Sequence, residues 1–169
     1  MKENFYIFLD IEGVLYDWQF IRKNKKCKED IIKTFNPESV KALNKLILNL
    51  EKYFNVNLVI SSTWRRNMLE TEKVLKQNKV YTECFIDRIG SNHMSCYRGK
   101  EIQDYLKYKN ETKNFVIIDD EWFDYVQVFG MEKVIKTHLI HGSLNMAQVN
   151  KFLQTFDNKL KNISNFEIC

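Results

Sequence analysis

A pair of carboxylates at the end of an apolar run is the part of this chain best suited to chemistry. Residues 5–9 (FYIFL) are apolar, Asp10 follows them, and Glu12 comes two positions later. Residues two apart in an extended chain project to the same side, so both carboxylates are expected to face one site. Gly13 allows a tight turn beside a bound substrate. One carboxylate that attacks phosphorus and another that moves a proton are the minimum for phosphoryl transfer through an aspartyl phosphate.

Two further apolar runs also end on chemically active residues. Residues 56–60 (VNLVI) lead into Ser61–Ser62, and residues 114–118 (NFVII) lead into Asp119–Asp120. The carboxyl ends of parallel strands meet at one edge of a sheet, where open α/β folds bind their ligands. We therefore expect all of these side chains to converge on one crevice.

The residue types in this crevice fit phosphoryl transfer with Mg²⁺. This ion takes oxygen ligands, and the expected ligands are Asp10, the backbone carbonyl of Glu12, Asp119 and Asp120. The Ser61 hydroxyl would donate to a phosphoryl oxygen. A cation near the start of the next helix, Arg98 or Lys100, would balance the charge that develops during transfer.

Two more residues are candidates for contact with a substrate. Ser62 could cap the helix that begins near Thr63, and a cap is compatible with binding of a phosphate at the same helix end. Arg65 lies one turn further on and would face either the substrate or solvent.

The elements that must position these residues alternate between strands and helices. Strands are predicted at 5–9, 56–60, 114–118 and 132–136, and residues 80–89 are predicted as a weaker strand with its following loop. Helices are predicted from Asn36–Pro37, over 64–77, after Gly99, and after a capping box formed by Asn145 and Gln148. This alternation predicts an α/β fold with a Rossmann-like, mostly parallel sheet and helices on both faces.

Length and composition favour one domain over residues 1–169. The chain carries a formal charge of +4, which permits an anionic substrate without requiring nucleic acid. Four cysteines without metal-ligand spacing are expected to be free thiols in a reducing compartment. No stretch has the apolar length of a membrane span, so a cytoplasmic protein is expected. The tail from residue 161 to 169 is expected to fray.

Residues 16–36 form a basic insertion or flap whose role has two interpretations. Its run of cations extends from Arg22 to Lys33. It could be a solvated surface segment, or it could contact a phosphate backbone, with Trp18 and Phe20 available for stacking on bases.

The motifs in this order resemble the haloacid dehalogenase (HAD) superfamily, most of whose members are phosphatases. LDIEGVL is similar to its first motif, LVISS to its second, Arg98 or Lys100 to its third residue and VIIDD to its fourth motif. SSTWR, YRGKEIQDYL and VIKTHLIHGSL resemble a capless branch, similar to the HAD domain of Swiss Army Knife RNA repair proteins. This resemblance covers residues 5 to 156, implies Mg²⁺ and no large cap domain, and favours Arg98.

The sequence departs from the family pattern at one position, because Glu12 stands where the family has aspartate. The longer side chain could place the acid differently. The resemblance implies a phosphatase of a phosphorylated nucleotide or polynucleotide end. The alternatives are a phosphatase of small metabolites or proteins, and a catalytically impaired domain that binds phosphorylated ligands or partners.

Overall fold

The computed structural model describes residues 2–24, 34–90, 97–111 and 113–166. The strands are β1 (Asn4–Leu9), β2 (Asn55–Ile60), β3 (Phe85–Arg88), β4 (Phe115–Asp119) and β5 (Val134–Lys136). The helices are α1 (Trp18–Asn24), α3 (Pro37–Leu50), α4 (Met68–Gln77), α5 (Arg98–Tyr108), α6 (Tyr125–Phe129) and α7 (Met146–Phe166). Two short 3-10 helices are η1 (Thr63–Arg66) and η2 (Met131–Lys133).

The five strands form one parallel sheet in the order β3-β2-β1-β4-β5, with β1 at the centre. Leu9, the last residue of β1, is level with Ile60 on one side and Ile118 on the other. The residues that come next along each strand therefore reach the same edge of the sheet. This register places Asp10, Ser61 and Asp119 side by side.

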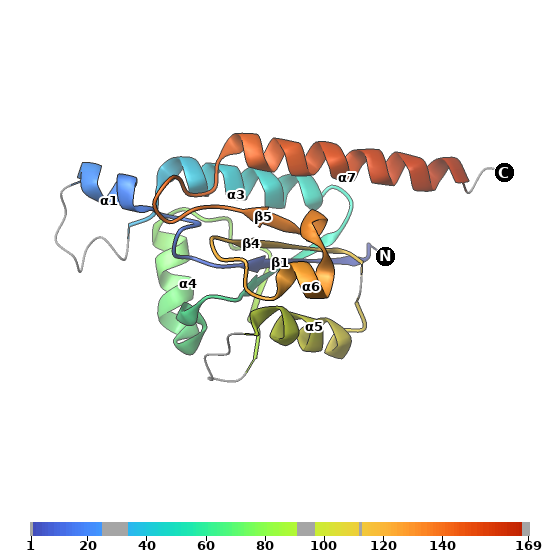
Figure 1. Ribbon diagram of the computed structural model, residues 1–169, viewed down its shortest axis with the longest axis horizontal. Coiled ribbons are helices and arrows are strands. Elements are labelled where there is room, and N and C mark those ends of the chain that lie inside the picture. The colour runs from blue at the N-terminus through green and yellow to red at the C-terminus, as the bar shows by residue number, and fades with distance from the viewer. Residues whose placement is uncertain (1, 25–33, 91–96, 112, 167–169) are drawn as a thin grey trace.

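Both faces of the sheet are covered by helices, as Figure 1 shows. Phe5, Ile7 and Leu9 of β1 point into the core cluster under α3 and α7, whereas Tyr6 and Phe8 point into the cluster under α5 and α6. A continuous apolar run is what a strand buried on both faces requires. The predicted α/β fold with a parallel sheet, helices on both faces and no large cap domain is confirmed.

Local capping explains where several helices begin. The Asn36 side chain accepts a hydrogen bond from the backbone N–H of Glu38, and Pro37 is the first residue of α3. Before α7, the Asn145 side chain accepts from the N–H of Gln148, and the Gln148 side chain accepts from the N–H of Asn145. Both predicted caps are confirmed.

The structure changes the bounds of other predicted elements. The single helix predicted over 64–77 is divided into η1 and α4 because Asn67 leaves helical geometry and caps the N–H of Glu70. Within residues 80–89, predicted as a strand with its following loop, the strand is Phe85–Arg88. The strand predicted at 132–136 is shortened to the three residues of β5, because residues 132 and 133 belong to η2. α7 is assigned as far as Phe166, and the fraying expected from residue 161 stays a prediction.

Several predictions lie outside the described residues. The basic run is described only as far as Asn24 in α1, and Cys27, Cys96 and Cys169 are not described either. Cys84 is a buried free thiol. Among the residues that the structure covers, no helix has both the length and the apolar character needed to cross a bilayer.

Asp17 holds the start of α1 against the loop before α7. Its buried carboxylate accepts hydrogen bonds from the N–H of Phe20, and from the N–H and hydroxyl of Ser143 at 2.9 and 2.7 Å. The Ser143 hydroxyl lies 2.8 Å from that of Ser39 in α3. Burial by itself raises the pKa of Asp17, but these hydrogen bonds outweigh it and lower the pKa below its ordinary value.

Replacing Asp17 with alanine is expected to lower the free energy of unfolding by about 2–4 kcal/mol, because buried donors lose their acceptor. The carboxylate contributes stability above its unfolded pKa, and this contribution is lost as it protonates in acid. The difference between the two proteins should therefore shrink below about pH 4. Urea unfolding near neutral pH and in acid measures this, with the exposed Asp157→Ala as control. An undiminished difference in acid would contradict the prediction.

Candidate active site

A cleft of about 530 Å³ opens at the carboxyl edge of the sheet. Its polar lining comes from the ends of β1 and β4 and from the start of α5, and consists of Asp10, Glu12, Arg98, Asp119, Asp120 and Glu121. Its apolar lining consists of Tyr16, Trp18, Ile21, Phe123 and Leu139. Segments far apart in the sequence thus form one concave surface.

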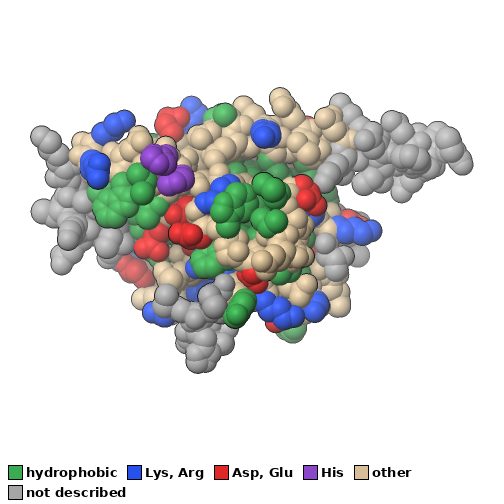
Figure 2. All heavy atoms as spheres, in the orientation of Figure 1, with side chains coloured by type: hydrophobic (Ala, Val, Ile, Leu, Met, Phe, Trp, Pro, Cys, Tyr) green, Lys and Arg blue, Asp and Glu red, His purple; other side chains and the backbone are tan. Residues whose placement is uncertain are grey.

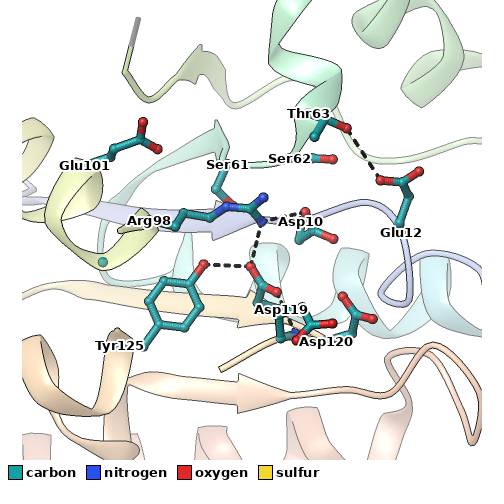
Figure 3. A network of polar contacts seen from close by, with 12 residues as sticks. Asp10, Glu12, Ser61, Ser62, Thr63, Arg98, Glu101, Asp119, Asp120 and Tyr125 are labelled. Atoms are coloured by element: carbon teal, nitrogen blue, oxygen red, sulfur yellow. Dashed lines mark hydrogen bonds and ion pairs between the residues drawn. The ribbon is translucent and has the colours of Figure 1, made fainter. Parts of the chain in front are cut away.

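Arg98 links the two strands that carry the buried aspartates. Its Nη1 lies 2.9 Å from Oδ1 of Asp10 and 3.0 Å from Oδ2 of Asp119, as Figure 3 shows. Its guanidinium carbon also lies 4.3 Å from the centre of the Phe123 ring, in cation–π contact. Burial disfavours the charged guanidinium, but Asp10 and Asp119 outweigh this effect and raise the pKa of Arg98. Arg98 is therefore a permanent cation at the base of the cleft.

The carboxyl groups in the cleft repel one another. Burial, followed by the charge of Asp119, raises the pKa of Asp10 well above its ordinary value. Burial also raises the pKa of Asp119, although Arg98 opposes the shift. Burial and the neighbouring Asp119 raise the pKa of Asp120 to about 6. One arginine does not neutralise this much negative charge, so a further cation would be favoured here.

The three aspartates could provide the ligands for such a cation. One carboxylate oxygen from each of Asp10, Asp119 and Asp120 lies within 4.8 Å of the others. Oxygen donors of this kind suit Mg²⁺. Gly13 makes room for this arrangement, since it has a φ of +68° and a Cβ there would overlap the carboxyl group of Asp120. The glycine predicted to contact substrate thus lies against Asp120 and is not among the described residues that line the cleft.

Asp119 is held in place by two further contacts. The buried Tyr125 hydroxyl donates to its Oδ2 at 2.7 Å, and the N–H of Glu121 donates to its Oδ1 at 2.8 Å. Tyr125 was missed by the sequence reasoning, because a tyrosine six residues after an aspartate has no recognisable pattern. Its contact depends on how α6 folds back over the end of β4.

Asp124 positions the helix that carries Arg98. Its two carboxylate oxygens accept from the N–H groups of Gly99 and Lys100 at 2.5 and 3.0 Å. A carboxylate is favourable at this end of a helix, where N–H groups lack partners. A Cβ at Gly99 would lie 2.7 Å from the same carboxylate, so the glycine permits the close approach. The loop after β4 therefore fixes the position of α5.

The structure separates the two candidates for the third motif. Arg98 lies in the cleft, whereas the exposed Lys100 side chain points along α5. Its Nζ donates to Gln103 at 3.1 Å and lies 3.6 Å from the Asp104 carboxylate. Because residues two apart on a helix face different directions, this geometry favours Arg98 as the third-motif residue. A catalytic role of Lys100 stays a prediction.

Glu12 lines the cleft, but its carboxylate is not part of the group of three aspartates. It is exposed, and its Oε2 lies 3.5 Å from the Thr63 hydroxyl (Figure 3). Burial, followed by the charge of Glu12, raises the pKa of Tyr16. The carboxylate thus lies toward solvent, where a leaving group or a water could reach it. If Glu12 binds a metal ion, its backbone carbonyl would be the ligand, because its carboxylate lies outside the group of three aspartates.

Ser61 and Ser62 have different surroundings. The Ser61 hydroxyl is fully buried at the same sheet edge as Asp10 and has no hydrogen-bond partner among the described residues. A buried hydroxyl left without a partner is costly and suggests a ligand atom. The Ser62 hydroxyl caps η1 by accepting from the N–H of Trp64.

Arg65 was predicted as a candidate for substrate contact, and the structure gives it another position. Its buried guanidinium pairs with Glu101 of α5 at 3.1 Å and donates to the carbonyl of Ser61 at 3.0 Å. It does not line the cleft. The geometry therefore favours a structural role, in which Arg65 links η1 to α5 and supports the backbone of Ser61.

Comparison with known protein families finds one match. The family model described as "HAD domain in Swiss Army Knife RNA repair proteins" matches residues 6–149. The matched range contains every cleft residue named above. Neither a curated protein nor a solved structure matches the chain.

Proposed function

Because this chain belongs to the family of HAD domains in Swiss Army Knife RNA repair proteins, we propose that it is a Mg²⁺-dependent phosphatase. Its substrate would be a phosphorylated nucleotide or the phosphorylated end of a polynucleotide. The observation that carries the proposal is Arg98 joined to both Asp10 and Asp119 at the base of a cleft, with Asp120 beside them. Members of this superfamily act on phosphorylated substrates in general.

The residues of the cleft fit a magnesium ion. Asp10, Asp119 and the backbone carbonyl of Glu12 would hold it, with Asp120 nearby, and the raised pKa values of the three aspartates favour a cation among them. The bound ion would neutralise the charge of the phosphate group.

Asp10 would act as the nucleophile. Its carboxylate oxygen attacks phosphorus, a bond forms between them, and the bond from phosphorus to the leaving oxygen breaks. Glu12 donates a proton to that leaving oxygen and then accepts one from a water. The water attacks phosphorus and the bond from phosphorus to Asp10 breaks. Inorganic phosphate is released, and the free carboxylate of Asp10 is restored. The exposed position of Glu12 suits both exchanges with groups that enter from solvent.

Arg98 and Ser61 would hold the phosphoryl oxygens. The guanidinium is already fixed by two aspartates, by the ring of Phe123 and by the capped start of α5, so it need not reorganise during transfer. The Ser61 hydroxyl, which has no partner among the described residues, would gain one when a phosphate binds.

The preference for nucleotides rests on the family and on the shape of the site. The family is named for RNA repair proteins. The cleft carries no large cap domain, which leaves it accessible to the end of a long molecule. Phosphatases of small metabolites more often enclose their substrates.

The test is a phosphatase screen over nucleotides, 3′- and 5′-phosphorylated oligonucleotides, sugar phosphates and phosphopeptides. Excess chelator is expected to reduce activity by at least about 100-fold, and added Mg²⁺ is expected to restore it, because the aspartates need the ion to present a phosphate to Asp10. Thermal unfolding with and without chelator controls for loss of fold. Binding of phosphorylated ligands without any turnover would instead favour the catalytically impaired domain, and unchanged activity in chelator would contradict the role of the metal.

A further inference from the structure

The cleft has an apolar wall that phosphate chemistry does not use. Its polar floor is sufficient for metal and phosphate, yet five apolar or aromatic residues complete the lining. At about 530 Å³ the cavity is in the size range of sites that enclose most of a small organic ligand. Figure 2 shows carboxylates gathered between hydrophobic side chains on this face. The wall therefore implies a leaving group with an apolar surface.

Trp18 presents an aromatic ring from a fixed backbone. It is the first residue of α1 and is 46% exposed. Its N–H donates to the carbonyl of Leu139 at 2.9 Å, and the preceding Asp17 is anchored by Phe20 and Ser143. A ring on such a support loses little freedom when a flat ligand stacks on it.

Phe123 supplies a second ring from the loop that follows β4. Its φ of +38° lies in the left-handed region, which is costly for a side chain of this size. The ring is nevertheless 38% exposed and lines the cleft, with Arg98 stacked on it. The strained backbone thus keeps an aromatic surface at the mouth of the site.

The charge of the lining restricts what a leaving group can carry. Among the described lining residues, five carboxylates face the single cation of Arg98; the carboxylates belong to Asp10, Glu12, Asp119, Asp120 and Glu121. A second phosphate close to the first would meet this negative field. A flat, uncharged group next to one phosphate is the better match.

We propose that Trp18 and Phe123 form a stacking site for the base of a terminal nucleoside monophosphate. This unit is shared by a free nucleotide and by the phosphorylated end of a strand. The inference rests on the proposed function and adds the part of the substrate that the protein recognises besides phosphate. Trp18 is the better probe, because Phe123 also supports Arg98.

The experiment compares Trp18→Ala with Trp122→Ala on matched substrates. Trp122 is 41% exposed but lines a different cavity, beside β5, so it controls for loss of an exposed tryptophan. The substrates are a purine nucleoside monophosphate, an oligonucleotide ending in the same phosphorylated nucleoside, and ribose 5-phosphate, which lacks the base. A fourth substrate, O-phosphotyrosine, has a different flat group.

For Trp18→Ala, KM for the nucleotide or the oligonucleotide is expected to rise by about 10-fold or more, with kcat little changed. In the same variant, KM for ribose 5-phosphate should stay within about 2-fold of that of the unchanged protein. Trp122→Ala should change neither the KM for the base-containing substrates nor the KM for ribose 5-phosphate. The base-containing substrate with the higher kcat/KM shows whether the protein takes the nucleoside monophosphate as a free nucleotide or as the end of a strand. The stacking site would be overturned if Trp18→Ala raised KM for ribose 5-phosphate as much as KM for the nucleotide, or raised KM for O-phosphotyrosine more. Either result would leave the proposed phosphatase activity in place.

If the unchanged protein hydrolyses none of these compounds, the proposed function fails separately. Calorimetric binding of the same nucleotide and of ribose 5-phosphate then tests the stacking site. A preference for the nucleotide that Trp18→Ala removes would still support the site, and equal or absent binding of the two would overturn it.

Discussion

Replacing Asp10 with asparagine is expected to lower kcat by at least about 10⁴-fold while the protein stays folded. The carboxylate of Asp10 lies at the end of the central strand beside Arg98. The amide that replaces it cannot attack phosphorus. The loss of one carboxylate from a crowded group also removes repulsion with Asp119, so stability without metal should change by no more than about 1 kcal/mol. Single-turnover and steady-state assays measure the first effect, and thermal unfolding measures the second.

The matched control for this prediction is Asp104→Asn, which changes an exposed carboxylate on α5. Its activity should equal that of the unchanged protein. Turnover in Asp10→Asn close to that of the control would exclude an aspartyl phosphate at Asp10. The hydrolysis would then have to use water directly.

Replacing Arg98 with alanine is expected to lower kcat/KM by about 10²- to 10³-fold. This side chain is the cation between Asp10 and Asp119, and in the proposed mechanism it holds a phosphoryl oxygen. Lys100→Ala should stay within about 2-fold of the unchanged protein, because its exposed ammonium contacts only Gln103 and Asp104 among the described residues. Steady-state kinetics on one substrate measures both variants.

The two variants control for each other, since each removes one positive charge from the first turn of α5. A loss in Lys100→Ala equal to that in Arg98→Ala would show that the charge of the helix matters more than the position of one guanidinium. A larger loss in Lys100→Ala would reverse the assignment.

The strand ends were the predictable part of the molecule. Buried strands have continuous apolar runs, and the residues just after Leu9, Ile60 and Ile118 share an edge because parallel strands run in register. This rule follows from chain geometry alone, and it brought Asp10 and Asp119 together without knowledge of any loop.

The contacts between distant elements were not predictable in this way. Arg65 pairs with Glu101, 36 residues further along the chain, and this pairing depends on where α5 packs. Asp124 caps the same helix from a separate loop. No local spacing encodes such pairs, because each is decided by the packing of one element on another. The sequence could therefore name the catalytic candidates but not the residues that hold them.

The position of Arg98 between two buried aspartates has a consequence for the protein when no metal ion is bound. The guanidinium is a built-in counter-ion for both carboxylates and offsets part of their repulsion, so we expect the chain to fold without a bound cation. Under the proposed function, the ion would then be required for turnover but not for folding.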